Sequence, residues 1–133
     1  MAAQALKLKP IELAKNANAL NKAIDWVIKA ETGKPILVYA SAPPDTVKEI
    51  QQKLGRDLAS SIVENAMAKI ASEAVKNGFR RIVVAGGETS GAVVSELGIN
   101  SILIGKEIDP GVPATVSVGT PIISLVLKSG NFG

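Results

Sequence analysis

The sequence contains no cysteine and no histidine. Without cysteine the chain can form neither a disulfide framework nor a thiolate metal site. Without histidine it can form neither a Ser-His-Asp triad nor the common zinc sites. Any acid–base chemistry must therefore come from Asp, Glu, Lys or Tyr side chains, or from another chain.

Aromatic residues are also scarce, at 3% of the chain, whereas hydrophobic residues reach 47%. The core must therefore be aliphatic, which is typical of α/β layers with buried parallel strands. A length of 133 residues is enough for one domain and too short for two. We expect a single domain over residues 1–133.

Strong charge and long apolar runs are absent as well. The 15 basic and 12 acidic residues give a net charge of +3, and the lysines are scattered without aromatic residues between them. This pattern argues against nucleic acid as a partner. No stretch approaches the ~18 apolar residues of a membrane span, and the first seven residues are too short for a signal peptide. We expect no membrane partner and a cytoplasmic location.

Apolar periodicity and turn residues predict alternating helices and strands. Helices are expected over 10–30, 46–54, 57–76 and 91–97, and strands over 35–40, 81–85, 101–105 and 121–127. This alternation predicts an α/β fold: a three-layer, Rossmann-like arrangement with a mostly parallel sheet and helices packed on it. Ligands of such sheets bind at the carboxyl ends of strands, where residues 41–42, 86–91 and 129–133 are expected to lie.

The most informative segment is the glycine-rich run that follows the strand at 81–85. Residues 86–91 read Gly-Gly-Glu-Thr-Ser-Gly and lead into a short apolar helix. Glycines leave backbone N–H groups uncovered, and a helix N-terminus adds the positive end of its dipole. Together they suit a phosphate group. The run is neither a Walker A motif, since the Gly-Lys-Ser/Thr end is missing, nor the dinucleotide G-x-G-x-x-G pattern.

Two structural alternatives apply to this run. Residues 86–91 could be only a tight strand-to-helix turn, with Thr89 or Ser90 as the N-cap. Glu88 could bind Mg²⁺ through water or accept a ribose or base hydrogen bond. It could equally be a first-turn acidic residue that the helix dipole favours.

Three further charged residues have open roles. Glu107 and Asp109 stand beside the turn signal Pro110-Gly111 and could bind a metal, or Asp109 could bond to nearby backbone in the turn. Lys128 ends an apolar strand and could neutralise a phosphate or lie in solvent.

Three ordered motifs, residues 86–94, 104–113 and 127–133, resemble the C-terminal nucleotide-binding domain of the four-carbon acid sugar kinase family. Residues 37–42, 47–55 and 80–85 are also similar to that family. The resemblance covers about residues 10–133.

The resemblance implies an ATP-dependent kinase that transfers a phosphoryl group to a hydroxyl of threonate, erythronate or an oxo-tetronate, with ATP and Mg²⁺ as cofactors. It assigns no metal ligand and no catalytic base. The alternative is a non-catalytic nucleotide- or phosphate-binding module, or a plain α/β interaction domain. The nucleotide-binding residues that the resemblance implies are Gly86, Gly87, Glu88, Thr89, Ser90, Gly111, Gly130 and Asn131.

The chain departs from the family pattern at both ends. We expect that it lacks the family's entire N-terminal domain and also an upstream Gly/Ser-rich nucleotide loop, and that it stops where the family continues into a final helix. We therefore expect residues 1–133 to be the C-terminal part of a larger two-domain kinase, truncated at its end and inactive alone. The acid sugar would bind mainly to the missing domain. The face left exposed could support a homo-oligomer.

Overall fold

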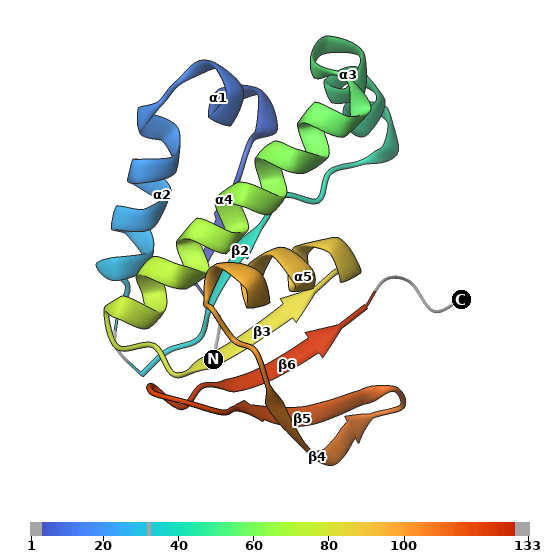
Figure 1. Ribbon diagram of the computed structural model, residues 1–133. Helices are drawn as coiled ribbons and strands as arrows, with labels where there is room; N and C mark the ends of the chain where they lie inside the picture. Colours follow the sequence, from blue (N-terminus) through green and yellow to red (C-terminus); the bar gives the residue numbers. More distant parts are fainter. Residues whose placement is uncertain (1–3, 32, 130–133) are drawn as a thin grey trace. The chain divides into compact units, whose positions relative to one another are not determined.

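A computed structural model describes residues 4–31 and 33–129 of the chain (Figure 1). Its contacts divide into two compact units, Met1–Ala66 and Met67–Gly133, and each unit is described by itself. The helices are α1 (Pro10–Lys15), α2 (Asn18–Ile28), α3 (Pro44–Leu54), α4 (Arg56–Lys76) and α5 (Gly87–Glu96). The strands are β1 (Gln4–Lys7), β2 (Ile36–Tyr39), β3 (Arg81–Ala85), β4 (Ile102–Asp109), β5 (Val112–Ser117) and β6 (Ser124–Lys128).

The first unit contains a two-stranded parallel sheet formed by β1 and β2, with Gln4 opposite Ile36. The strand expected over 35–40 is confirmed as β2, whereas β1 was not expected. A backbone hydrogen bond from Leu8 N–H to the Tyr39 carbonyl, 2.7 Å long, continues the pairing beyond β1.

The single helix predicted over 10–30 is wrong, because the chain breaks it into α1 and α2. Asn16 has extended backbone angles, φ −126° and ψ 111°. Its side-chain oxygen accepts a hydrogen bond from the Asn18 N–H at 2.9 Å. A side chain that bonds to backbone two residues ahead offers the chain an alternative to helical bonding. The break therefore follows from Asn16 itself.

The helix predicted over 46–54 begins earlier than expected, and the helix predicted over 57–76 begins close to its predicted start. α3 starts at Pro44 rather than at residue 46, because proline is favoured at the first helical position. Gly55 ends α3 with a φ of 82°, which other residues rarely adopt. α4 matches the predicted 57–76 to within one residue, and its last ten residues belong to the second unit.

The second unit contains a four-stranded sheet in the order β3-β6-β5-β4. β3 and β6 are parallel, with Val83 opposite Val126, whereas β5 is antiparallel to both β6 and β4. The α/β class is thus confirmed. The prediction of a mostly parallel sheet is confirmed only in part, because β3 and β6 are the one parallel pair in this sheet. β3 matches its predicted range, β5 was not expected, β4 runs past the predicted residue 105 to Asp109, and β6 begins at Ser124 rather than at 121.

The core of the second unit forms where α4 and the sheet meet. Leu125 of the inner strand β6 is fully buried, and it clusters with Ile123 and Val75. α5 packs against β3 and β6 on one face of the sheet (Figure 1). Partly buried side chains complete the cluster: Ile82, Leu97, Ile99, Ile102 and Leu127.

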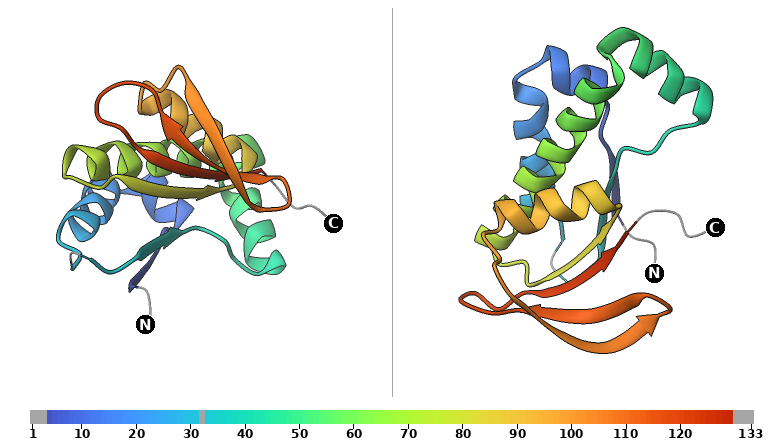
Figure 2. Two further views of the ribbon diagram at one scale, coloured as in Figure 1. Left: turned by 90° about the horizontal axis from the view of Figure 1, so that it is seen from below. Right: turned by 45° about the vertical axis from the view of Figure 1, so that its right-hand side comes forward.

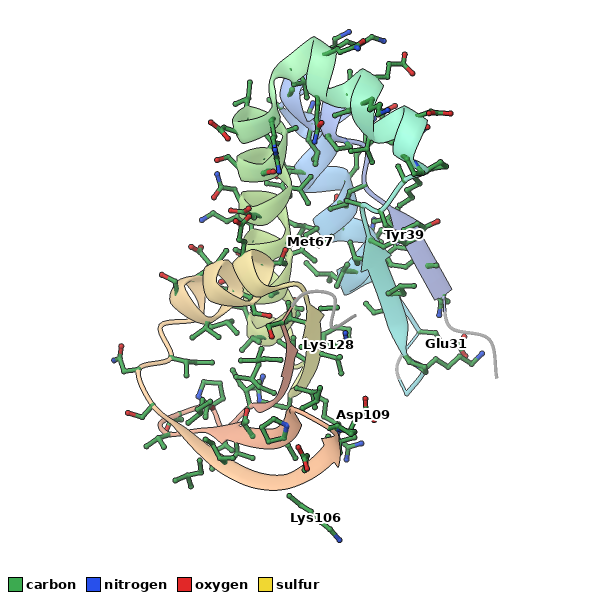
Figure 3. All side chains as sticks on the ribbon, turned by 90° about the vertical axis from the view of Figure 1, so that its right-hand side faces the viewer. Glu31, Tyr39, Met67, Lys106, Asp109 and Lys128 are labelled. Atoms are coloured by element: carbon green, nitrogen blue, oxygen red, sulfur yellow. The ribbon has the colours of Figure 1, made fainter. Side chains whose placement is uncertain are left out.

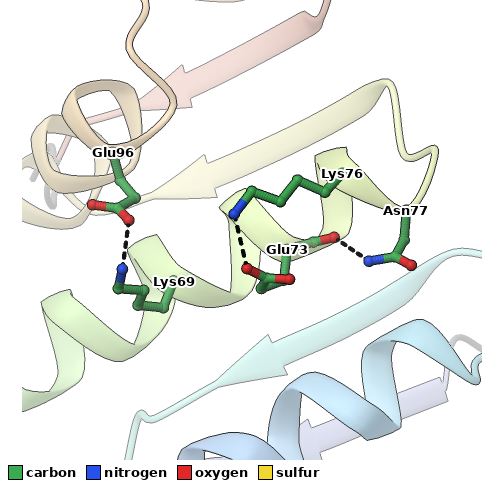
Figure 4. A network of polar contacts seen from close by, with 5 residues as sticks. All are labelled: Lys69, Glu73, Lys76, Asn77 and Glu96. Atoms are coloured by element: carbon green, nitrogen blue, oxygen red, sulfur yellow. Dashed lines mark hydrogen bonds and ion pairs between the residues drawn. The ribbon is translucent and has the colours of Figure 1, made fainter.

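Polar contacts link α5 to the end of α4 (Figure 4). The Lys69 ammonium lies 3.0 Å from a Glu96 carboxylate oxygen, and Lys76 pairs with Glu73 at 3.1 Å. The Asn77 amide donates to the Glu73 carbonyl at 2.7 Å and closes the end of α4. Exposed pairs of this kind contribute under about 1 kcal/mol each, so burial rather than charge holds α5 in place.

Within the described residues, none of the helices has both the length and the apolar character that a transmembrane helix requires.

Candidate functional site

The glycine-rich run forms a sharp turn followed directly by a helix. Gly86 has φ 112° and ψ 128°, a backbone conformation that glycine adopts readily, and it is the N-cap of α5. The Ser90 N–H donates to the Gly86 carbonyl at 2.9 Å and closes the first helical turn. α5 therefore begins at Gly87, and the predicted start at residue 91 is wrong.

This earlier start changes where the candidate residues lie. Glu88, Thr89 and Ser90 were expected in a loop, but they form the first turn of α5. The alternative with Thr89 or Ser90 as the N-cap is also wrong, because Gly86 holds that position without a side-chain cap. Glu88 is exposed. It lies in the first turn, where the helix dipole favours a negative charge.

The N-terminus of α5 has the features of an anion site. An α-helix leaves the N–H groups of its first turn without intrahelical acceptors and has a partial positive charge there. The Ser90 N–H is the first to bond to a carbonyl within the turn, that of Gly86, so the N–H groups that could face an anion are those of Gly87, Glu88 and Thr89. Gly87 has no side chain to cover them.

The end of β6 lies directly beside this helix start. The Gly86 N–H donates to the Lys128 carbonyl at 2.7 Å. A Cβ atom on Gly87 would lie 3.9 Å from the Cβ atom of Ser129. Two of the three predicted strand-end segments therefore meet. Ser129 was predicted as part of the strand-end segment 129–133, but it was not among the nucleotide-binding residues that the resemblance implied, and it directly follows β6.

The other predicted site residues are placed differently. Ser41 and Ala42 belong to the first compact unit. Gly130 and Asn131 lie outside the described residues. The Lys128 side chain is exposed at the end of β6, where Figure 3 labels it.

The Asp109-Pro110-Gly111 segment forms the turn between β4 and β5, as predicted. The Gly111 N–H donates to a Glu107 carboxylate oxygen at 2.7 Å. A carboxylate therefore does bond to backbone in this turn, as one of the two alternatives expected, but the carboxylate is that of Glu107 rather than that of Asp109. Figure 3 labels Lys106 and Asp109 on this hairpin.

The hairpin turn and the glycine turn lie at the same end of the sheet. β5 is antiparallel to β6 with Ala114 opposite Val126, so the chain before Ala114 runs toward the end of β6. In Figure 1 the ends of β3 and β6, the start of α5 and the β4–β5 turn share one end of the sheet. This arrangement places Gly111 at the same end as Gly86. Among the described residues, no group of three or more acidic side chains could hold a metal ion.

One polar group near the start of α5 has no partner. The Ser90 hydroxyl oxygen is buried and makes no hydrogen bond with any described residue. Ser90 is 9% exposed and Val93 is 2% exposed, so both lie on the buried face of α5. A buried hydroxyl without a partner normally costs free energy, and such groups call for an explanation. A ligand or further polypeptide at this end of the sheet would supply one.

We expect Ser90→Ala to stabilise the chain when no ligand is present. The change removes the unpaired hydroxyl and introduces a better helix former, so the free energy of unfolding should rise by about 1 kcal/mol. Urea denaturation followed by circular dichroism measures it, with Ser95→Ala on the exposed side of the same helix as the matched control. A loss of stability at Ser90 would mean that its hydroxyl has a bonding partner within the chain.

The whole chain, residues 1–133, matches the family described as nucleotide-binding C-terminal domain. It is 46% identical over 129 residues to the 3-oxo-tetronate kinase of Pseudomonas savastanoi pv. phaseolicola, covering 97% of the chain and 30% of that protein. It is likewise 46% identical over 129 residues to the 3-oxo-tetronate kinase of Cupriavidus necator, covering 97% of the chain and 29% of that protein.

A solved structure agrees with these relatives. The crystal structure of a Haemophilus influenzae protein superposes with a TM-score of 0.90 at 42% identity, covering 98% of this chain and 32% of that one. The chain thus spans about 30% of the length of the curated relatives it matches. The predicted resemblance is confirmed, and the chain belongs to the family of nucleotide-binding C-terminal domains.

Proposed function

We propose that the chain is the ATP-binding domain of a kinase that phosphorylates a hydroxyl of a four-carbon acid sugar of the 3-oxo-tetronate type. The observation that carries this proposal is the turn at Gly86, which directs the N-terminus of α5 toward the end of β6. The kinase names of relatives at 46% identity support the substrate class.

Phosphoryl transfer requires positioned phosphates and neutralised charge more than a nucleophile on the protein. The N–H groups at the start of α5 would bind phosphate oxygens, and the uncovered backbone at Gly87 would allow close approach. Lys128, exposed at the end of β6, would add a positive charge on the same side. This mechanism needs neither cysteine nor histidine, and the chain has neither.

The residues at the start of α5 could hold Mg²⁺ only together with the phosphates of a bound nucleotide. Mg²⁺ prefers oxygen ligands and usually keeps several waters beside one or two carboxylates and substrate phosphates. Glu88 is the one carboxylate in the first turn of α5, and it would reach the ion through water. Bound there, Mg²⁺ would neutralise charge on the phosphate oxygens.

The remaining parts of the reaction would come from the polypeptide outside these residues. We place most of the acid-sugar site and the base that activates its hydroxyl there, in a cytoplasmic enzyme. Gly111 would contribute from the β4–β5 turn, and Gly130 and Asn131 from the segment after β6.

Calorimetric titration of the chain with Mg²⁺ and ATP, against adenosine as a control, tests the nucleotide site. We expect ATP to bind at least about tenfold more tightly than adenosine, because the phosphates supply the contacts with α5. The same titrations are made on a chimera in which the chain replaces the matched segment of the Cupriavidus necator kinase. Equal affinity for ATP and adenosine would rule out the proposal. So would a result in which neither the chain nor the chimera binds ATP.

A further inference from the structure

The end of α4 carries a reactive residue pair. Asn77 is followed by Gly78, the one Asn-Gly pair in the sequence, where the chain passes from α4 into β3 (Figure 2). The side-chain carbonyl carbon of an asparagine can be attacked by the backbone nitrogen of the next residue, which makes asparagine a thermolabile residue. Glycine favours this attack, because it has no Cβ atom and adopts backbone angles that other residues rarely reach. The pair therefore combines a reactive amide with an unhindered nitrogen.

The reaction of this pair consumes water and nothing else. The Gly78 nitrogen bonds to the Asn77 Cγ atom and gives up its proton, and the bond from Cγ to the side-chain nitrogen breaks, so that ammonia leaves. The product is a cyclic succinimide. Water then opens the ring at either carbonyl carbon and leaves an aspartate or an isoaspartate at position 77. An amide and water are thus converted to a carboxylic acid and ammonia, and nothing is oxidised or reduced.

In the folded chain both reacting groups are engaged in hydrogen bonds. The Asn77 side-chain amide donates to the Glu73 carbonyl at 2.7 Å (Figure 4). The Gly78 N–H donates to the Val75 carbonyl at 3.1 Å. This second bond belongs to a Schellman motif, which commonly ends a helix at a glycine with positive φ, and the φ of Gly78 is 102°. Both bonds must break before the Gly78 nitrogen can reach the Asn77 side chain.

Further contacts hold this helix end closed. The Phe79 N–H donates to the Ala74 carbonyl at 3.0 Å, which completes the Schellman motif. The Arg80 guanidinium donates through Nη1 to the Val75 carbonyl at 2.8 Å and to the Phe79 carbonyl at 2.9 Å. Val75 is 8% exposed and belongs to the buried cluster around Leu125. The end of α4 is therefore held against the core of the second unit.

We propose that Asn77 is a site of spontaneous modification, converted to aspartate or isoaspartate through Gly78, and that opening of the end of α4 controls the rate. The Gly78 nitrogen attacks only after its N–H has left the Val75 carbonyl and the Asn77 amide has left the Glu73 carbonyl. Helix ends open locally at a lower free energy than the whole fold, so the reaction occurs during such openings. Every group in this step lies in residues 73–80 of the second unit.

The modification makes further opening easier. A carboxylate at position 77 cannot donate to the Glu73 carbonyl, and its negative charge lies at the C-terminal end of α4, where the helix dipole is also negative. Isoaspartate adds a methylene group to the backbone and shifts Gly78 away from the Val75 carbonyl. Because ammonia has left, the helix end cannot return to its original form.

Peptide mass spectrometry tests the site. The chain is incubated in its folded form and unfolded in urea, at the same mildly alkaline pH, and the conversion of Asn77 is followed over time. We expect conversion at least about tenfold slower in the folded chain, because the open helix end is a minor population. In the unfolded chain Asn77 should convert faster than Asn65, because Asn65 is followed by an alanine whose Cβ atom hinders the attack.

Arg80→Ala tests whether the helix end controls the rate, and Arg81→Ala is its matched control. The change at Arg80 removes the bonds to the Val75 and Phe79 carbonyls and leaves the Asn-Gly pair intact. Conversion in the folded chain should become about fivefold faster, as the loss of one net hydrogen bond predicts. Arg81 is exposed at the start of β3, so its change should leave the rate as it is. If Arg80→Ala does not fold, Arg80→Lys takes its place, because it keeps the charge and lacks the guanidinium group.

Three results would overturn the proposal. An Asn77 that does not convert in the unfolded chain would remove the site. Equal rates in the folded and unfolded chains, with circular dichroism showing the first to be folded, would mean that opening of α4 does not control the reaction. Equal rates for the two arginine variants would mean that the contacts of Arg80 do not hold the helix end closed.

Discussion

Replacing Gly87 with aspartate should remove most phosphate-dependent nucleotide binding while leaving the fold intact. Gly87 is the first residue of α5, and among the described residues a Cβ atom there would meet only the Ser129 Cβ atom at 3.9 Å, an ordinary contact. A carboxylate at that position faces the phosphates that α5 would bind. Two unit charges about 6 Å apart at an effective dielectric constant of about 20 repel by about 3 kcal/mol, or roughly 100-fold in Kd.

The matched control is Gly87→Asn, which has nearly the same size and no charge. Titration of both variants with Mg²⁺ and ATP separates repulsion from crowding, and adenosine binding should be the same in both. Aspartate in the first turn of a helix is favoured by the dipole, so the free energy of unfolding should not fall. Equal ATP affinity of the two variants would mean that phosphate does not approach Gly87.

The start of α5 shows how far the sequence could predict the site. The glycine turn, the helix after it and the neighbouring strand end were all predictable, because Gly86 and Gly87 directly follow an apolar strand. The first residue of the helix was not, since residues 87–91 include two glycines and have low helix propensity. The hydrogen bond from Ser90 to Gly86, and packing of Ser90 and Val93 on the buried face, start the helix there. Tertiary packing commonly decides such cases.

β5 could not be predicted for a related reason. It contains Pro113, and its buried positions include Thr115 and Ser117, which are 6% and 4% exposed. The Thr115 hydroxyl donates to the Leu125 carbonyl at 2.9 Å, and the Ser117 hydroxyl accepts from the Ile123 N–H at 2.8 Å. Hydroxyls can be buried when they are bonded in this way. Both partners lie in or beside β6, so the local pattern gives no signal of a strand.

Strands with apolar sequences were predicted more closely than those defined by distant partners. The run at 81–85 is bounded by Arg81 and Gly86, and its limits match β3. β1 is only four residues long, and it pairs with β2 some thirty residues later. A strand this short is set by its partner rather than by its own periodicity. The α/β class was therefore predictable, whereas the share of parallel pairs was not.

Leu125→Ala should cause the largest loss of stability of any single substitution discussed for this chain. Leu125 is 0% exposed, and it lies in β6 between Ile82 of β3 and Thr115 of β5. Replacing a buried leucine with alanine costs about 2–5 kcal/mol, because the surrounding side chains close the cavity only in part. Small domains have free energies of unfolding of about 5–15 kcal/mol, so the change removes a large share.

Ile122→Ala is the control, because Ile122 is three residues away in sequence and 65% exposed, so its removal should change stability by at most about 0.5 kcal/mol. Urea denaturation followed by far-ultraviolet circular dichroism is the suitable measurement. A loss of about 3 kcal/mol lowers the urea midpoint by about 1.5 M for an m-value of about 2 kcal/mol/M. Equal midpoints for the two variants would contradict the assignment of Leu125 to the centre of this core.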